Sequence, residues 1–173
     1  MSRWSELAGS KRRVSVNISS LQLQQPHFVA QLEKILRAEH IHPDQFQLEI
    51  TENILMEKRK ENVAKLNVLQ KKGFRIAIDD FGTGYSSLSY LKTFPIDVLK
   101  VDKSFIKDLP EDEADKAIVK ATIRLGTDLG LEMVAEGVES MEAAAYLRAI
   151  GCHVLQGFYF AKPMPFNQLL KSV

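Results

Sequence analysis

The sequence predicts an α/β fold, in which helices cover a parallel β-sheet. Six short segments typical of strands, rich in Val, Ile, Leu or Phe, alternate with six segments typical of amphipathic helices. The chain has 173 residues, close to the length of one domain. Such alternation gives right-handed crossovers, so the sheet is either an open doubly wound sheet or a (β/α) barrel. A complete barrel of eight units needs at least about 200 residues, so only about six units fit here.

The predicted strands are short segments rich in Val, Ile, Leu or Phe. The clearest covers residues 74–79, because it is nearly continuous in apolar character up to an acidic end, as strands buried on both faces are. The six predicted strands cover residues 13–18, 46–51, 74–79, 98–102, 133–136 and 154–160.

The segments between the strands carry apolar residues at steps of three and four, the spacing of a helix with one buried face. Three of them are followed by a glycine that predicts the helix end, at Gly73, Gly130 and Gly151. The predicted helices cover residues 23–41, 61–72, 86–94, 113–129, 141–150 and 166–173.

The composition excludes several classes of protein. With 23 Lys and Arg residues against 22 Asp and Glu residues, the net charge of +1 argues against a nucleic-acid module with a basic face. The single cysteine, Cys152, excludes an internal disulfide framework and favours the reducing cytoplasm. No apolar segment approaches the roughly 18–20 residues of a membrane span, and no secretory signal begins the chain. We therefore expect a cytoplasmic protein with no nucleic-acid or membrane contact.

Polar side chains stand near the carboxyl ends of the predicted strands, within otherwise apolar segments. Because parallel strands point the same way, these ends meet at one rim, where such folds place their active sites. Taken singly, Asp80 could cap a helix and Lys100 could be a structural counter-ion. Asn17 or Gln156 could each bond a loop backbone. Their coincidence on six strands favours a functional site, made of Asn17, Glu49, Asp79, Asp80, Lys100, Glu136 and Gln156.

This set contains carboxylates and amides but neither cysteine nor histidine. Oxygen ligands suit Mg²⁺ or Mn²⁺ rather than Zn²⁺. We expect Cys152 to pack in the interior rather than to react. The four histidines form no ligand pattern; they are His27, His40, His42 and His153.

Two glycines, Gly82 and Gly84, bracket Thr83 directly after the strand that ends in two aspartates. One interpretation is a tight strand-to-helix turn capped by Ser86 or Ser87. The other is a mobile loop whose backbone approaches a metal or a phosphate. The preceding aspartates favour the second interpretation.

In order along the chain, these motifs resemble the later part of an EAL domain, the bacterial cyclic di-GMP phosphodiesterase. The resemblance implies a modified TIM-type (β/α) barrel of eight units, of which about six are expected here. Residues 1–12 would be the remnant of the preceding helix and linker, and residues 13–173 the matched units. The family's Glu-Ala-Leu motif lies upstream of these units, so we expect it to be missing. The matching motifs are VNIS, LEITEN, IDDFGTGYSSLSYL, LKVDKSFI, VAEGVES and QGFYFAKPMP.

The resemblance also implies a chemistry, hydrolysis of cyclic di-GMP to linear pGpG by two Mg²⁺ or Mn²⁺ ions that clamp the phosphate and activate water. Asn17, Glu49 and Asp79 would bind one metal ion. Asp79 would bridge to a second ion held by Asp80.

The remaining motif residues receive their roles in the same way. Lys100 would hold the attacking water or the developing negative charge, and Glu136 would be either a metal ligand or a general base. With Asp80, they form the implied catalytic set. Glu52 would anchor the DFGTGYSSL loop. Asp102 and Gln156 would support the water or substrate, and Glu139, in the motif VAEGVES, would be a supporting residue around the site.

Three functional hypotheses follow. The first is a metal-dependent phosphodiesterase domain of a longer parent protein, with weak or no activity in this chain alone. The second is an inactive module that senses cyclic di-GMP or binds a protein. The third is a fragment with no activity of its own. The implied partners are cyclic di-GMP and a fused GGDEF or sensory domain of the parent. Because an incomplete barrel leaves two sheet edges unpaired, we also expect a homodimer or aggregation.

Overall fold

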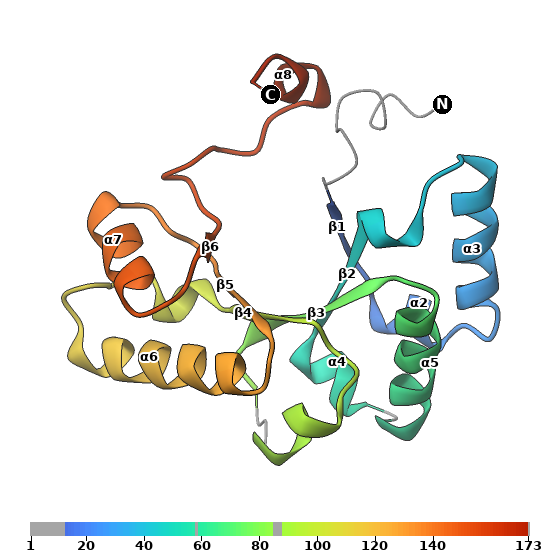
Figure 1. The fold of residues 1–173 in the computed structure, drawn as a ribbon, viewed down its shortest axis with the longest axis horizontal. Helices are drawn as coiled ribbons and strands as arrows, with labels where there is room; N and C mark the ends of the chain where they lie inside the picture. Colours follow the sequence, from blue (N-terminus) through green and yellow to red (C-terminus); the bar gives the residue numbers. More distant parts are fainter. Residues whose placement is uncertain (1–12, 58, 85–87, 173) are drawn as a thin grey trace.

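The fold was examined in a computed structural model that describes residues 13–57, 59–84 and 88–172. Its six strands form one sheet in the order β1-β2-β3-β4-β5-β6, and every neighbouring pair is parallel. Figure 1 shows the curled sheet with helices on its outer side. A sheet whose order never reverses places all its right-handed crossovers on one side. This settles the choice between the two architectures in favour of an incomplete barrel.

The strands agree with the predicted segments to within one or two residues at most ends. The exception is the last, which we predicted over residues 154–160 and which pairs over only two residues. After it the chain turns, because the Phe160 and Ala161 amides bond back to the Gly157 carbonyl. The strands are β1 (Val14–Asn17), β2 (Phe46–Thr51), β3 (Arg75–Phe81), β4 (Val98–Val101), β5 (Glu132–Ala135) and β6 (Val154–Leu155).

Two predicted helical segments differ in the structure. The segment 23–41 is split at Pro26, since proline cannot continue a helix, and the first piece starts at a Ser19 capping box. The segment 86–94 is a 3₁₀ helix where it is described, whereas Ser86 and Ser87 lie outside the described residues. The helices beyond β1 are α2 (Ser20–Gln24), α3 (Phe28–Ala38), η2 (Pro43–Gln45), α4 (Glu52–Met56), α5 (Arg59–Lys71), η3 (Leu88–Thr93), η4 (Lys103–Phe105), α6 (Glu113–Asp128), α7 (Met141–Ala149) and α8 (Phe166–Ser172).

Helix α4 was not predicted, because five residues are too few to show a helical period. It is held by Asn62, a buried side chain of α5 whose amide donates to the Ile54 and Glu57 carbonyls. The glycines predicted the ends of α5, α6 and α7 well. Gly73, Gly130 and Gly151 each stand two residues beyond one of these helices.

The sheet has two faces with different surroundings. Its outer face packs against the helices and forms the main core, with Leu48, Ile76 and Leu99 almost fully buried. On the inner face, Ala77, Val98 and Val134 form a small separate cluster. Since side chains alternate along a strand, the residue two positions after Val98 shares this inner face. That residue is Lys100, so the polar rim stands directly above the small apolar cluster.

Cys152 is buried in the main core, as predicted, and its thiol lies 3.6 Å from the Met133 carbonyl. Burial raises the pKa of the Cys152 thiol to about 11. We expect about one thiol in a thousand to be ionised at pH 8, so a thiol reagent should label the folded protein far more slowly than the urea-unfolded protein. Labelling kinetics with Ellman's reagent check this, and equal rates in both states would contradict the burial.

Strands β1 and β6 are the edges of the sheet within the described part of the chain. The described residues include no helix long and apolar enough to cross a membrane. The predicted helix remnant in residues 1–12 lies outside the described residues.

Candidate functional site

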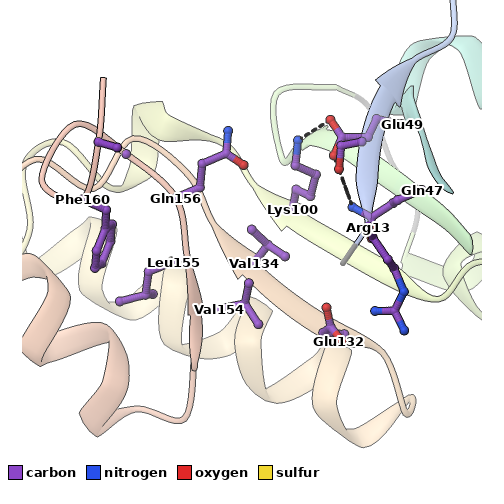
Figure 2. Close-up of a pocket in the computed structure, with 13 residues that line it drawn as sticks. Arg13, Gln47, Glu49, Lys100, Glu132, Val134, Val154, Leu155, Gln156 and Phe160 are labelled. Carbon is purple, nitrogen blue, oxygen red and sulfur yellow. Dashed lines mark hydrogen bonds and ion pairs between the residues drawn. The ribbon is translucent and has the colours of Figure 1, made fainter. Parts of the chain in front are cut away.

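Lys100 is the centre of the polar rim on the inner face. It stands on β4 with its side chain only 3% exposed, and its Nζ donates a hydrogen bond of 2.8 Å to Glu49 Oε2 on β2 (Figure 2). Glu136 Oε1, directly after β5, lies 2.7 Å from the same nitrogen. Asp79 Oδ1 of β3 lies 2.9 Å from it. The ends of four neighbouring strands therefore meet at one ammonium group.

The two consecutive aspartates reach the same place because β3 is irregular there. In a regular strand, Asp79 and Asp80 would point to opposite faces of the sheet. The pairing with β4 shifts register between Ile78 and Phe81, and Asp80 has a left-handed backbone with φ of 54°. Bulges of this kind redirect side chains beside functional sites. As a result, oxygens of Asp79, Asp80 and Glu136 all lie within 4.8 Å of one another.

We call Glu49, Asp79, Asp80 and Glu136 the rim carboxylates. Four acidic groups surround one lysine, so the rim carries excess negative charge when all are ionised. Burial disfavours the charged form of Lys100, but its contacts with Glu136, Glu49 and Asp79 together outweigh burial and raise its pKa. The lysine is therefore a fixed cation at neutral pH.

Two of the rim carboxylates are held in unfavourable surroundings. Burial is the main cause that raises the pKa of Glu136, despite the neighbouring Lys100. Burial also raises the pKa of Asp80, and the charges of Asp79 and Asp102 raise it further. Clusters of this kind, in which ionisation is opposed, are typical of functional sites.

The rim carboxylates fit a divalent cation. All the converging ligand atoms are carboxylate oxygens, which suit Mg²⁺ or Mn²⁺. Asp79 Oδ1 is buried, and its ion-pair partner in the described part of the chain is the Lys100 ammonium at 2.9 Å. Buried charges need balancing partners, and three of the four rim carboxylates share this one lysine. The cluster therefore has both the donor set and the excess negative charge that a divalent cation would balance.

The turn formed by residues 80–84 carries Asp80 into the cluster. The Thr83 hydroxyl donates to the Asp80 carbonyl over 2.8 Å and closes the turn. The buried Glu52 of α4 accepts a hydrogen bond from the Gly82 amide through Oε2, at 3.2 Å. A Cβ on Gly84 would lie 2.7 Å from Glu52 Oε1, so the chain passes tightly over this carboxylate. These contacts fit the predicted anchoring role of Glu52.

The other predicted site residues surround the rim at greater distance. Asn17 is paired in register with Glu49 but is exposed on the edge strand β1. Gln156 follows β6 and lines the same cavity as Lys100. Asp102 caps η4 by accepting from the Ser104 amide at 2.8 Å. Glu139 is exposed on the loop after β5, and it is not in the cluster.

The structure decides two roles that the sequence left open, those of Asp80 and Lys100. Asp80 does not cap a helix among the described residues, because its backbone is left-handed whereas N-caps are extended. Lys100 is indeed a counter-ion, for three carboxylates at once. All four histidines are exposed, and none belongs to the cluster; they are His27, His40, His42 and His153.

A cavity of about 430 Å³ opens along the inner face of the sheet. Figure 2 shows Glu49 and Lys100 at one end of it and Arg13 and Glu132 toward the other. Sequence reasoning missed Gln47, a buried side chain whose amide donates 3.2 Å hydrogen bonds to Glu49 Oε1 and to Ser15. The signal was available, since Gln47 precedes Glu49 by two residues and therefore shares its face.

Comparison with known proteins finds one family for most of the chain. Residues 1–163 match the EAL domain. The chain is 41% identical to the bifunctional diguanylate cyclase/cyclic di-GMP phosphodiesterase MucR of Pseudomonas aeruginosa, over all of this chain and 25% of MucR. The chain thus spans about a quarter of the length of this curated relative.

Solved structures of similar fold include proteins of the same family. The fold matches PaMucR phosphodiesterase in a complex with c-di-GMP with a TM-score of 0.91 at 40% identity, covering 96% of this chain and 67% of that one. It also matches Klebsiella pneumoniae BlrP1 in a complex with manganese and cyclic di-GMP, with a TM-score of 0.85 at 35% identity. That match covers 92% of this chain and 41% of BlrP1.

Proposed function

Because this chain belongs to the EAL domain family, we propose that it forms a metal-dependent phosphodiesterase site that hydrolyses cyclic di-GMP to linear pGpG. The observation that carries the proposal is the convergence of the rim carboxylates around Lys100. Relatives with a similar fold bind c-di-GMP, and one of them also holds manganese. The proposal concerns the domain; the activity of a longer parent protein follows from it only as a further proposal.

In this proposal, the rim carboxylates and Asn17 would hold two divalent ions, Mg²⁺ or Mn²⁺. Asn17, Glu49 and Asp79 would hold one ion, and Asp79 and Asp80 would hold the other. Asp79 suits a shared role because it lies beside Glu49 around Lys100 and its oxygen lies within 4.8 Å of an Asp80 oxygen. When bound, the ions supply Lewis-acid activation of water and neutralise phosphate charge.

The residues of the chain then direct the displacement. A water oxygen bonds to phosphorus while the bond from phosphorus to the 3′ oxygen breaks, which leaves the 5′ phosphate of pGpG. Lys100, a fixed cation, orients the water or stabilises the charge that develops on the phosphoryl oxygens. Glu136 either completes the ligand set or accepts the proton of the water, a role that its raised pKa suits.

Neighbouring residues keep this arrangement in place. Glu52 anchors the turn of residues 80–84, and Asp102 supports the water or substrate. Gln156 faces the cavity, where it can contact substrate or water, and Glu139 supports the loop after β5. These roles are proposals that targeted substitutions can separate.

Incubation of the chain with cyclic di-GMP and Mn²⁺, followed by chromatography of the products, tests the proposal. We expect pGpG to form slowly, since only weak activity is expected of this chain alone. We expect its rate to fall at least about a hundredfold in Glu49→Ala, because even residues that only orient metal ligands cost 10–100-fold. Glu132→Gln is the matched control, since Glu132 lines the same cavity but pairs with Arg75 far from the rim.

Two outcomes would contradict the proposal. Product that persists unchanged in Glu49→Ala would place the chemistry outside the rim. Binding of cyclic di-GMP without any product, measured by calorimetry in the same buffer, would favour the inactive sensor or interaction module instead.

A second copy of the chain, paired through the edge strands β1 and β6, is the proposed macromolecular partner, alongside a fused cyclase or sensory domain of a parent protein.

A further inference from the structure

Helix η4 touches two loops that carry rim carboxylates. A Cβ on Gly82, in the turn that carries Asp80, would lie 2.8 Å from Phe105 Cε2. A Cβ on Gly137, next to Glu136, would lie 2.5 Å from Lys103 Cβ. The short η4 therefore sits between the loops that follow β3 and β5, with direct contact to each.

The Phe105 ring leaves no room for a side chain on Gly82. Gly82 has a φ of 101°, a conformation that residues with a Cβ rarely adopt, and the phenyl ring occupies the space where a Cβ would stand. On its other side, Gly82 donates its amide to Glu52. The turn is thus clamped from two elements, by a carboxylate of α4 and by an aromatic ring of η4.

Asp80 needs such a clamp. Its left-handed backbone is strained for a residue with a side chain, and strained positions persist only where the surroundings over-determine them. Oxygens of Asp79 and Glu136 also lie within 4.8 Å of an Asp80 oxygen, and like charges at such a distance repel. Without an external constraint, the turn would relax and move the Asp80 side chain away from Asp79 and Glu136.

We propose that Phe105 is a positioning residue for the metal site: its ring fixes Gly82 in the left-handed turn and thereby holds the Asp80 carboxylate against Asp79 and Glu136. The inference deepens the proposed function and rests on it for the identity of the ligand. Phe105 does not line the cavity of about 430 Å³ and does not belong to the carboxylate cluster, so its effect passes through the backbone of the turn. It also packs against the main core.

The test compares Phe105→Ala with Phe46→Ala in the full chain. Phe46 is also partly buried against the core, but it stands at the start of β2, at the opposite end of the strand from the rim. The first measurement is amide hydrogen exchange of Gly82 and Thr83 by NMR, which reports opening of the turn without any metal. The second is Mn²⁺ affinity by calorimetry.

We expect Phe105→Ala to speed exchange at Gly82 by about tenfold or more and to weaken Mn²⁺ binding by about 10–100-fold. Phe46→Ala should leave both unchanged, although it lowers stability. Phe105→Leu, which keeps contact with the core, should lie between wild type and Phe105→Ala and covers the case in which the alanine variant does not fold.

The outcomes separate this inference from the proposed function. Unchanged Gly82 exchange in a folded Phe105 variant overturns the clamp. Faster exchange with unchanged Mn²⁺ affinity overturns the positioning role. If the wild-type chain binds no Mn²⁺, the proposed metal site is wrong, and the exchange measurement still decides whether Phe105 holds the turn.

Discussion

Replacing Lys100 with methionine is expected to lower the free energy of unfolding by about 3–5 kcal/mol, the usual cost of breaking a buried ion pair from one side. Methionine fills a similar volume but leaves Glu49, Asp79 and Glu136 without their shared cation. The three carboxylates would then repel one another in a site where the lysine side chain is only 3% exposed. Urea denaturation followed by circular dichroism measures the loss.

Lys116→Met is the matched control. Lys116 pairs with Glu113, whose side chain is 84% exposed, so its loss should leave the urea midpoint nearly unchanged. The folded-state pKa of Lys100 lies above its ordinary value, so its stabilisation is fully present below the ordinary lysine pKa and is lost only as pH rises through the folded value. The difference between wild type and Lys100→Met should therefore be as large at pH 9 as at pH 7. A Lys100→Met variant as stable as Lys116→Met would contradict this account of the rim.

Replacing Asp80 with asparagine is expected to have the opposite effect on the metal-free protein and raise its stability by roughly 0.5–1 kcal/mol, a modest gain because solvent screens this half-buried group. The substitution removes one negative charge beside Asp79 and Asp102. Asparagine also tolerates the left-handed backbone that Asp80 adopts. Because the folded-state pKa of Asp80 is raised, its ionised form costs stability at neutral pH, and asparagine avoids that cost.

The same substitution should damage the proposed function. Loss of a carboxylate ligand is expected to weaken Mn²⁺ binding at least about a hundredfold. A residue whose removal stabilises the fold but abolishes binding is the signature of a site kept for function at the expense of stability. Asp108→Asn, which alters an exposed ion pair with Lys107, should change neither property. A destabilised Asp80→Asn variant would contradict the proposed repulsion.

The fold was largely predictable because its strands are buried on the outer face and therefore apolar in sequence. Segment 46–51 matches β2 at both ends. The last strand was predicted too long because the aromatic residues after Leu155 resemble a strand in composition, while their backbone turns at Gly157. Such turns depend on tertiary contacts with Val138, which lie outside any local sequence pattern.

The candidate site was also predictable only in part. The rim residues could be predicted from polar side chains at strand ends, whereas the irregularity that turns Asp79 and Asp80 to one side could not. A strict two-residue period would have placed Asp80 on the outer face. The proposed positioning role of Phe105 could not be predicted either. An aromatic residue after a strand is typical of the core, and only the position of the ring beside Gly82 indicates another role.

The most direct measurement is a Mn²⁺ titration of the metal-free chain, followed by electron paramagnetic resonance of the free aqua ion, for wild type and Asp80→Asn. We expect the signal of free Mn²⁺ to be suppressed by wild-type protein in a saturable way, and to remain nearly unsuppressed with Asp80→Asn. Equal suppression by both proteins, or none by either, would contradict a divalent metal site at the rim carboxylates.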